Sequence, residues 1–390
     1  MWTAHQMSLT SGIQRAQYRP APRPSPLKGR GGHYYDGAMP WAFGYANPRA
    51  IHWGPGALAQ LAPELKRLQM NRVALFTNRS LLTEGKLIEK VRGAMGEAEA
   101  PTTVVISQHA PHTEIDAAVE ETTEAGVDGV VSFGGGSAID AAKMVAVKLA
   151  DRRGLAYRGL PHIAIPTTLS AAELAGGAGF TNEAGDKAGM RDVRLLLDTV
   201  IYDAEVTVAT PMALWLSTGI RAMDHGVEGF LAEGEHPFSD TLALEGIRRL
   251  FASLPRAMAA PADLEVRTEN QLAAWFTFTL PGQSAGGLSH VMGKQIGARH
   301  GIPHGVTSCL LLPHVLRFLA ERMPERVAKL GEATGSGDAA GDIQRLVVSL
   351  GLPQHIADYG IGEPELRRAA SELGGKYPSA ELLRIYLEAL

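Results

Sequence analysis

The segment GGGSAIDAAK, residues 134–143, is the stretch that decides the fold of this chain. It follows VDGVVSF, residues 127–133, an apolar run that predicts a buried strand, and it leads into an alanine-rich segment with helical periodicity. Glycines between a strand and a helix let the backbone approach a ligand closely. The unpaired N–H groups at the start of the helix favour phosphate oxygens. Gly134, Gly135, Gly136 and Ser137 are therefore candidate phosphate-binding residues, although such a turn is often only structural.

Strand and helix patterns alternate on both sides of this segment. The predicted strands lie at residues 51–56, 72–77, 103–107, 127–133, 162–165 and 200–202. Helical spacing of apolar residues separates several of them. This order predicts an α/β fold with a doubly wound, Rossmann-like parallel sheet that binds its ligand at the carboxyl ends of the strands.

Strand patterns disappear after about residue 211. Helical stretches follow at residues 214–232, 239–259, 271–280, 304–322 and 364–373. We therefore expect a dinucleotide-binding α/β domain over residues 46–207 and an all-helical catalytic domain over residues 208–390. Residues 1–45 carry several basic residues and prolines, with no acidic residue before Asp36, and are expected to form a flexible tail.

Composition restricts the classes of partner. A net charge of −4 argues against nucleic acid and anionic membranes, because no basic excess exists to neutralise phosphates. No apolar run reaches the length of a membrane span. Cys309 is the only cysteine, which excludes a disulfide framework and fits a reducing cytoplasm. An α/β half that binds a nucleotide and a helical half that supplies the chemistry form a common enzyme plan, with the small-molecule site in the cleft between the two halves.

Three histidines in the helical half are candidates for chemistry: His225, His290 and His304. A single histidine is more often a surface residue or a hydrogen-bonded core residue than a ligand. Imidazoles that are distant in sequence but close in space can bind a divalent metal or transfer protons.

These segments together resemble the iron-containing alcohol dehydrogenase superfamily and, within it, the maleylacetate reductase branch. The resemblance runs from about residue 51 to the helices beyond residue 314. It is carried by residues 134–143, 166–173 (PTTLSAAE), 200–203 (VIYD), 225–228 (HGVE) and 302–306 (IPHGV). The second of these segments is one residue shorter than in the metal-dependent members, as in the reductase branch.

The resemblance implies hydride transfer between an alcohol and a carbonyl, with NADH or NADPH as cofactor. It assigns the pyrophosphate and nicotinamide side to residues 134–137 and Asp140, and the same cleft to Thr167, Thr168 and Lys187. Asn78 takes the place of an aspartate that contacts the adenosine ribose in NAD-preferring relatives. Because Asn78 and Arg79 would not repel a 2′-phosphate, NADPH is expected to be accepted. The alternative is a plain helix start with a basic surface residue. The family also implies a homodimer.

Two residues depart from the metal-dependent pattern, in which one aspartate and three histidines hold iron or zinc. Arg221 stands where the aspartate is expected, four residues before His225 and thus on the same helical face. Lys294 replaces a histidine four residues after His290. Added positive charge weakens metal binding, so we expect no metal. If a metal is bound, His225, His290 and His304 would hold it. Arg221 could instead form a salt bridge with Asp224 or Glu228, and Lys294 could be a solvated helix residue.

The leading hypothesis is an NAD(P)H-dependent reductase of an anionic oxo acid, such as a maleylacetate-like compound. Arg221 and Lys294 would stabilise the developing alkoxide or bind a substrate carboxylate. His304 or His225 would supply the proton. The alternatives are a metal-dependent alcohol or aldehyde dehydrogenase, a lyase of the dehydroquinate synthase kind, and a nucleotide-binding protein without turnover.

Overall fold

The structure is a computed structural model that describes residues 48–390, apart from residues 84, 156–158, 235 and 279–286. The predicted tail, residues 1–45, lies outside these residues. The first half is built on a six-stranded sheet in which every neighbouring pair is parallel. In spatial order its strands are β1 (Ala50–Trp53), β8 (Thr199–Tyr202), β5 (His162–Pro166), β4 (Gly129–Gly134), β2 (Arg72–Asn78) and β3 (Glu99–Ile106).

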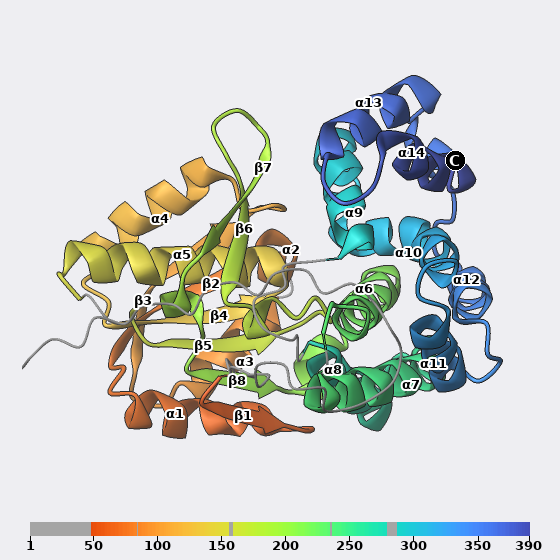
Figure 1. The fold of residues 1–390 in the computed structure, drawn as a ribbon. Coiled ribbons are helices and arrows are strands. Elements are labelled where there is room, and N and C mark those ends of the chain that lie inside the picture. Colours follow the sequence, from red (N-terminus) through yellow and green to blue (C-terminus); the bar gives the residue numbers. More distant parts are fainter. Residues whose placement is uncertain (1–47, 84, 156–158, 235, 279–286) are drawn as a thin grey trace, which may run out of the picture. The chain divides into compact units, whose positions relative to one another are not determined.

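Helices cover both faces of this sheet (Figure 1). They are α1 (Leu61–Arg67), α2 (Arg79–Thr83), α3 (Gly85–Ala94), α4 (His112–Glu124) and α5 (Gly136–Arg152), with short 3-10 turns η1 (Ala57–Gln60), η2 (Ala172–Leu174), η3 (Val193–Leu195) and η4 (Ala204–Thr207). Alternate residues of β2 enter two separate cores, because successive side chains of a strand point to opposite faces. Val73 and Leu75 pack with α1 and α3, whereas Ala74 and Phe76 pack with α4 and α5. The predicted doubly wound parallel sheet is thus confirmed.

A small antiparallel hairpin was not predicted from the sequence. It consists of β6 (Gly177–Thr181) and β7 (Lys187–Arg191) and forms a sheet of its own. Both strands contain glycine (GAGFT and KAGMR), which weakens the alternating apolar pattern by which strands are recognised. The hairpin adjoins α5, since Asp140 Oδ2 accepts a hydrogen bond from the backbone N–H of Gly179 at 2.9 Å.

The second half is helical, as predicted, and contains more helices than the sequence suggested. Its elements are α6 (Met212–Phe230), α7 (Pro237–Ala259), α8 (Leu264–Thr277), α9 (Leu288–His300), α10 (His304–Ala320), α11 (Pro324–Thr334), α12 (Ala339–Ser349), η5 (Ile356–Tyr359), α13 (Glu363–Leu373) and α14 (Ser379–Glu388). Helices α9, α11, α12 and α14 were not predicted, and α8 begins before residue 271. None of the helices in the described residues is long and apolar enough to cross a membrane. The domain boundary at 207/208 stays a prediction.

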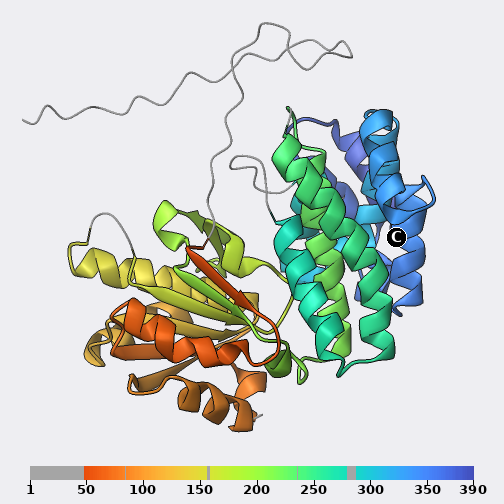
Figure 2. The same ribbon diagram turned by 90° about the horizontal axis from the view of Figure 1, so that it is seen from below.

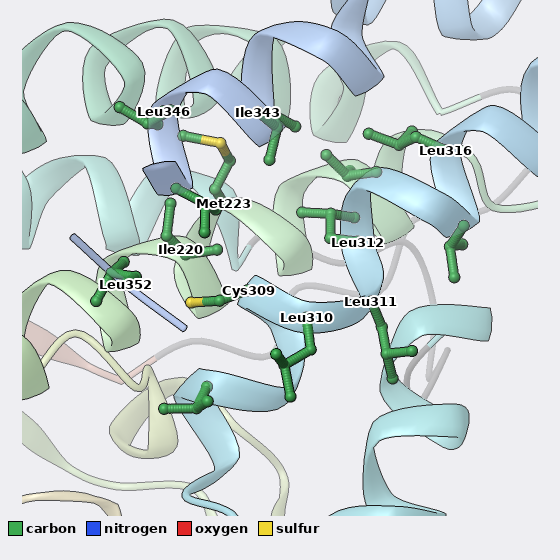
Figure 3. Close-up of a cluster of buried hydrophobic side chains, with 14 of the residues drawn as sticks. Ile220, Met223, Cys309, Leu310, Leu311, Leu312, Leu316, Ile343, Leu346 and Leu352 are labelled. Carbon is green, nitrogen blue, oxygen red and sulfur yellow. The ribbon is translucent and has the colours of Figure 1, made fainter. Parts of the chain in front are cut away.

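Helices α6 and α10 lie at the centre of the helical core, where α6, α7 and α8 also pack side by side (Figure 2). Ile220 and Met223 of α6 meet a run of leucines on α10, and Leu346 of α12 closes the cluster (Figure 3). The two central helices approach closely at Gly305, where an added Cβ would lie 2.9 Å from the backbone carbonyl of Ser217. This contact places the start of α10 beside α6.

A buried lysine fixes the loop that leads from β5 to the hairpin. Lys143 of α5 is 1% exposed. Its ammonium donates hydrogen bonds to the carbonyl oxygens of Ala172, of Ala175 at 2.7 Å and of Gly177 at 3.1 Å. Three carbonyls from one loop therefore depend on one side chain, which holds that loop over the first turns of α5.

Replacement of Lys143 by Met is expected to lower the free energy of unfolding by roughly 2–3 kcal/mol, because buried carbonyl oxygens lose their donor. The matched control is Lys148→Met on the same helix, whose pair with Asp116 is exposed, and it should change stability by less than about 0.5 kcal/mol. Urea denaturation at neutral pH measures both. Equal effects of the two substitutions would contradict this role of Lys143.

Candidate active site

One cleft of about 1690 Å³ is lined by the carboxyl ends of the sheet strands and by helices α6, α9 and α10. Every site residue predicted from the sequence lines it except Gly134, which is buried. These lining residues are Asn78, Gly135, Gly136, Ser137, Asp140, Thr167, Thr168, Lys187, Arg221, His225, His290, Lys294 and His304. Residues from seven segments of the chain are therefore brought to one concave surface, the usual form of a small-molecule site.

The glycine-rich turn is fixed by Asn78. Gly134 has φ = 157°, and an added Cβ would lie 2.5 Å from Asn78 Oδ1, so a larger residue does not fit. Asn78 Oδ1 accepts a hydrogen bond from Gly135 N–H at 2.9 Å, and its Nδ2 donates to the Ile106 carbonyl at 3.1 Å. Asn78 thus joins the carboxyl ends of β2, β3 and β4. Its amide atoms are engaged within the chain at the position where the resemblance places a ribose contact.

Helix α5 begins directly after this turn, and Gly135, Gly136 and Ser137 at its start line the cleft. The N–H groups of a first helical turn have no partner inside the helix. An added Cβ on Gly135 would lie 3.2 Å from Thr168 Cγ2, and one on Gly136 would lie 3.1 Å from Ser170 Oγ. The glycines therefore allow the segment after β5 to pack closely against the start of α5. This geometry fits the phosphates of a dinucleotide.

Asp140 and Lys187 follow one turn further into the cleft. Burial raises the pKa of Asp140, while Lys143 and Lys187 act in the opposite direction. Burial lowers the pKa of Lys187, and the charge of Arg221 lowers it further. Lys187 therefore brings a cation from β7 to the part of the cleft that faces the helical half.

Arg221 lies at the base of the helical side of the cleft and is 2% exposed. Its Nη1 donates to Asp224 Oδ2 at 3.1 Å and to Ser308 Oγ at 3.0 Å. Asp224 Oδ2 also accepts from Ser289 Oγ at 2.9 Å and from Ser308 Oγ at 2.7 Å. The salt bridge to Asp224 that the sequence left open is thus formed. It ties α6, α9 and α10 together at one carboxylate.

The three histidines lie together above this ion pair. The ring centroids of His225 and His290 are 6.4 Å apart, and those of His290 and His304 are 5.0 Å apart. His290 Nε2 lies 3.4 Å from Arg221 Nη2, which makes it the acceptor. Burial lowers the pKa of His225 and of His304 well below the ordinary value, and Arg221 lowers both further. Both rings are therefore neutral at pH 7.

Lys294 places a second cation near Arg221. Within the described residues it forms no hydrogen bond or ion pair that would neutralise it. Burial lowers its pKa, and the charges of Arg221, Lys187 and Arg191 lower it further. Asp140 acts on the pKa of Lys294 in the opposite direction. Asp140 and Glu228 also line the cleft, and burial raises the pKa of both carboxyls, which favours their neutral forms. This part of the cleft therefore gathers more positive than negative charge.

Sequence reasoning missed several residues of the site. Asp224, Ser289 and Ser308 hold Arg221 in place, and Glu228 Oε1 accepts a hydrogen bond from His290 N–H at 2.8 Å. Their partners are distant in sequence, so no local pattern indicates them. His109 also lines the cleft, from the loop after β3. One signal in the sequence indicated His109, namely that it follows a predicted strand. The carboxyl ends of parallel strands meet at the edge of the sheet where ligands bind.

Comparison with known proteins decides the family. Residues 48–204 match the family described as iron-containing alcohol dehydrogenase, and residues 215–374 match its C-terminal domain. The chain belongs to the iron-containing alcohol dehydrogenase family. It is 33% identical over 333 residues to a maleylacetate reductase of Pseudomonas sp. (strain P51), which covers 85% of this chain and 91% of that protein. The maleylacetate reductase branch is thereby confirmed, and the protein is an NAD(P)-dependent oxidoreductase.

Solved structures of iron-containing alcohol dehydrogenase relatives share the whole fold. A maleylacetate reductase from Agrobacterium tumefaciens matches with a TM-score of 0.80 and 28% identity, covering 90% of this chain and 99% of that chain. A 1,3-propanediol oxidoreductase matches with a TM-score of 0.83 and 24% identity, covering 90% and 100%; at that identity the likeness concerns the fold alone. Membership of this oxidoreductase family argues against two of the alternatives considered from the sequence. These are a lyase of the dehydroquinate synthase kind and a nucleotide-binding protein without turnover.

The residues present do not fit the metal centre that this alcohol dehydrogenase family implies. Within the described parts of the chain, no group of three His, Cys, Asp or Glu side chains comes close enough to hold an ion. Nε2 of His290 lies 3.4 Å from Nη2 of Arg221, so one of the three imidazoles faces a guanidinium. A metal at the three imidazoles would also lie beside that permanent charge, at an energetic cost.

Arg221→Met is expected to lower the free energy of unfolding by about 3–5 kcal/mol, because Asp224 is left buried without its cation. The double variant Arg221→Met with Asp224→Asn should recover at least half of that loss, since no uncompensated charge remains. The control is Arg248→Met, which breaks a pair of the same spacing with Glu245 on the surface of α7 and should change stability by about 0–1 kcal/mol. Urea denaturation measures all three. An additive double variant would contradict the coupling.

Proposed function

We propose that this chain reduces the carbonyl group of an anionic oxo acid with NAD(P)H and without a metal. The observation that carries the proposal is the set of cations around one part of the cleft: Arg221, Lys294 and Lys187. Asp224 neutralises Arg221 in part. Burial raises the pKa of Asp140 and of Glu228, which favours their neutral forms. Lys294 is therefore left to attract a negative substrate. A maleylacetate-like compound, with carboxylates near its carbonyl, is the substrate class that this charge suits best.

The cofactor would lie along the edge of the sheet. The N–H groups at the start of α5 and the Ser137 hydroxyl would bind its phosphates, as helix N-termini favour anions. Thr167, Thr168, Asp140 and Lys187 would line the rest of its path toward the helical half. When bound, the reduced nicotinamide supplies a hydride to the substrate carbonyl.

Lys294 would lie beside the substrate oxygen that gains charge during reduction. An ammonium there stabilises the developing alkoxide. Its lowered pKa also makes it a stronger acid than an ordinary lysine. His304 is neutral, so it would donate its N–H proton to the alkoxide while its other nitrogen accepts a proton from a solvent hydronium ion, which leaves the ring neutral again. His225, neutral and packed edge-on against Phe278 at 4.8 Å, would serve as the alternative donor.

The metal-free part of the proposal rests on Arg221. Its guanidinium contacts both Asp224 and Nε2 of His290. A fixed cation in that place can polarise the substrate oxygen in the way a Lewis acid does in the metal-dependent members. The competing proposal is an alcohol or aldehyde dehydrogenase that retains iron or zinc on His225, His290 and His304, all of which line the cleft.

We propose NADPH as an accepted and preferred cofactor. Asn78 places no carboxylate near the adenosine ribose, and its amide is engaged by the glycine-rich turn. The exposed Arg79 lines the cleft next to it. A guanidinium suits a 2′-phosphate because it presents several donors to an anion.

Two further proposals concern the protein's assembly and location. The sheet has β1 at one edge, and Trp53 at the end of this strand is 55% exposed. A homodimer formed through this edge would cover the open side of β1 and the Trp53 side chain. Light scattering, which gives the molar mass in solution, tests this proposal. The single cysteine, buried Cys309, fits a reducing cytoplasm.

The anionic substrate class is tested with an oxo acid and its methyl ester, in assays of NADPH oxidation. The acid should be at least about tenfold better in kcat/KM, because the ester lacks the charge that the cations attract. Lys294→Gln should raise KM for the acid by about tenfold and leave KM for the ester within twofold. Lys148→Gln, on the outer face of α5, is the control and should change neither. Equal use of acid and ester by the unaltered enzyme would refute the proposed substrate class.

The cofactor preference is tested with Arg79→Ala. This variant should raise KM for NADPH by about tenfold and leave KM for NADH unchanged, since only NADPH carries the 2′-phosphate. Lys86→Ala, an exposed lysine in α3 outside the cleft, is the control for a general change in charge. If Arg79→Ala affects both cofactors alike, Arg79 does not read the 2′-phosphate.

A further inference from the structure

The loop after β3 holds two successive residues in a backbone conformation that L-amino acids rarely adopt. His109 has φ = 68° and Ala110 has φ = 47°. Neither is glycine, and each such residue costs free energy, of the order of 1 kcal/mol or more. This conformation persists only where surrounding contacts stabilise it.

Two other segments of the cleft supply these contacts. Ser137 Oγ, in the first turn of α5, accepts a hydrogen bond from His109 N–H at 3.0 Å. Thr181 of β6 donates from its hydroxyl to the His109 carbonyl at 3.2 Å and from its N–H to the Ala110 carbonyl at 3.3 Å. The backbone of His109 is therefore held by the phosphate-binding turn on one side and by the hairpin on the other.

The imidazole of His109 is directed into the cleft beside Lys187. Its Nδ1 lies 3.5 Å from Lys187 Nζ. An ammonium has only donors, so Nδ1 is the acceptor and the ring hydrogen lies on Nε2. Burial lowers the pKa of His109, and the charge of Lys187 lowers it further, which keeps the ring neutral at pH 7. The side chain lines the cleft, so its Nε2–H is the donor that remains for a ligand.

Ser137 lines the same cleft as the His109 ring. Because its oxygen accepts from His109 N–H, its own hydroxyl hydrogen is free to donate to an anion at the start of α5. Lys187 adds a positive charge next to the ring. Three donors of different kinds, an imidazole, a hydroxyl and an ammonium, are thus linked through His109.

We propose that His109 is a binding residue for the pyrophosphate of the dinucleotide, donating Nε2–H to a phosphate oxygen while it holds Ser137 and Lys187 toward the same group. The left-handed backbone of His109 lies beside the first turn of α5, where Ser137 accepts its N–H. This inference rests on the proposed binding of NAD(P)H in the cleft. It adds a specific prediction, namely that the ring recognises phosphate and not the adenosine.

The test compares ADP with adenosine, each displacing NADPH fluorescence from the full chain. His109→Ala should weaken ADP binding by about 10–100-fold, the effect of losing a hydrogen bond to a charged group. Adenosine binding should stay within twofold. His112→Ala is the matched control: it removes a histidine at the first residue of α4, three residues further along the chain, that does not line the cleft, and it should change neither constant.

A second variant separates the ring from the backbone. Asn tolerates the left-handed conformation better than most residues, so His109→Asn keeps the loop but shortens the donor, and it should show the same selective loss for ADP. Equal weakening of ADP and adenosine in both variants would mean a purely structural role, and unchanged ADP binding would mean no role; either result overturns the inference. Failure of the unaltered protein to bind NADPH would instead overturn the proposed cofactor, before any variant is compared.

Discussion

The ion pair between Arg221 and Asp224 is the interaction on which the helical side of the cleft depends. Oδ2 of Asp224 accepts a hydrogen bond from the Arg221 guanidinium. The same oxygen accepts hydrogen bonds from the hydroxyls of Ser289 and Ser308. Three helices, α6, α9 and α10, therefore meet at one buried atom. Hydrogen bonds from three groups to this one oxygen help to offset the cost of removing two charges from water. The position of His290 follows from the same arrangement, since its Nε2 faces the other arm of Arg221.

The sheet side of the cleft has its own fixed point in Asn78, which joins the ends of three strands through the glycine-rich turn. Two hydrogen bonds join the sheet half to the helical half at the segment after β5. Leu169 N–H donates to Thr218 Oγ1 at 3.1 Å, and Thr210 Oγ1 donates to the Thr167 carbonyl at 2.7 Å. The turn that would bind phosphate and the helix that carries Arg221 are thus positioned by the same short segment after β5.

Much of this arrangement could be predicted from the sequence, because its signals are local. The glycines at residues 134–136, the strand and helix alternation and the late series of helices predicted the parallel sheet and the helical half. Arg221 and His225 share a face because they lie one helical turn apart. These features need only periodicity and turn chemistry.

The remainder depends on contacts between distant residues, which one sequence does not reveal. Ser289 and Ser308 are ordinary helix residues until folding brings them to Asp224. His109 has no local motif for its left-handed backbone, which is stabilised by Ser137 and Thr181 from elsewhere in the chain. The hairpin of β6 and β7 was missed because its glycines weaken the alternating pattern.

The central proposal is that the guanidinium of Arg221 polarises the substrate oxygen in place of a metal ion. It is tested most directly by elemental analysis of the purified protein, combined with NADPH oxidation before and after chelation. The account predicts less than about a tenth of a metal ion per chain and full activity after chelation. Near-stoichiometric iron or zinc with activity lost on chelation would contradict it, and would mean that His225, His290 and His304 hold a metal beside Arg221.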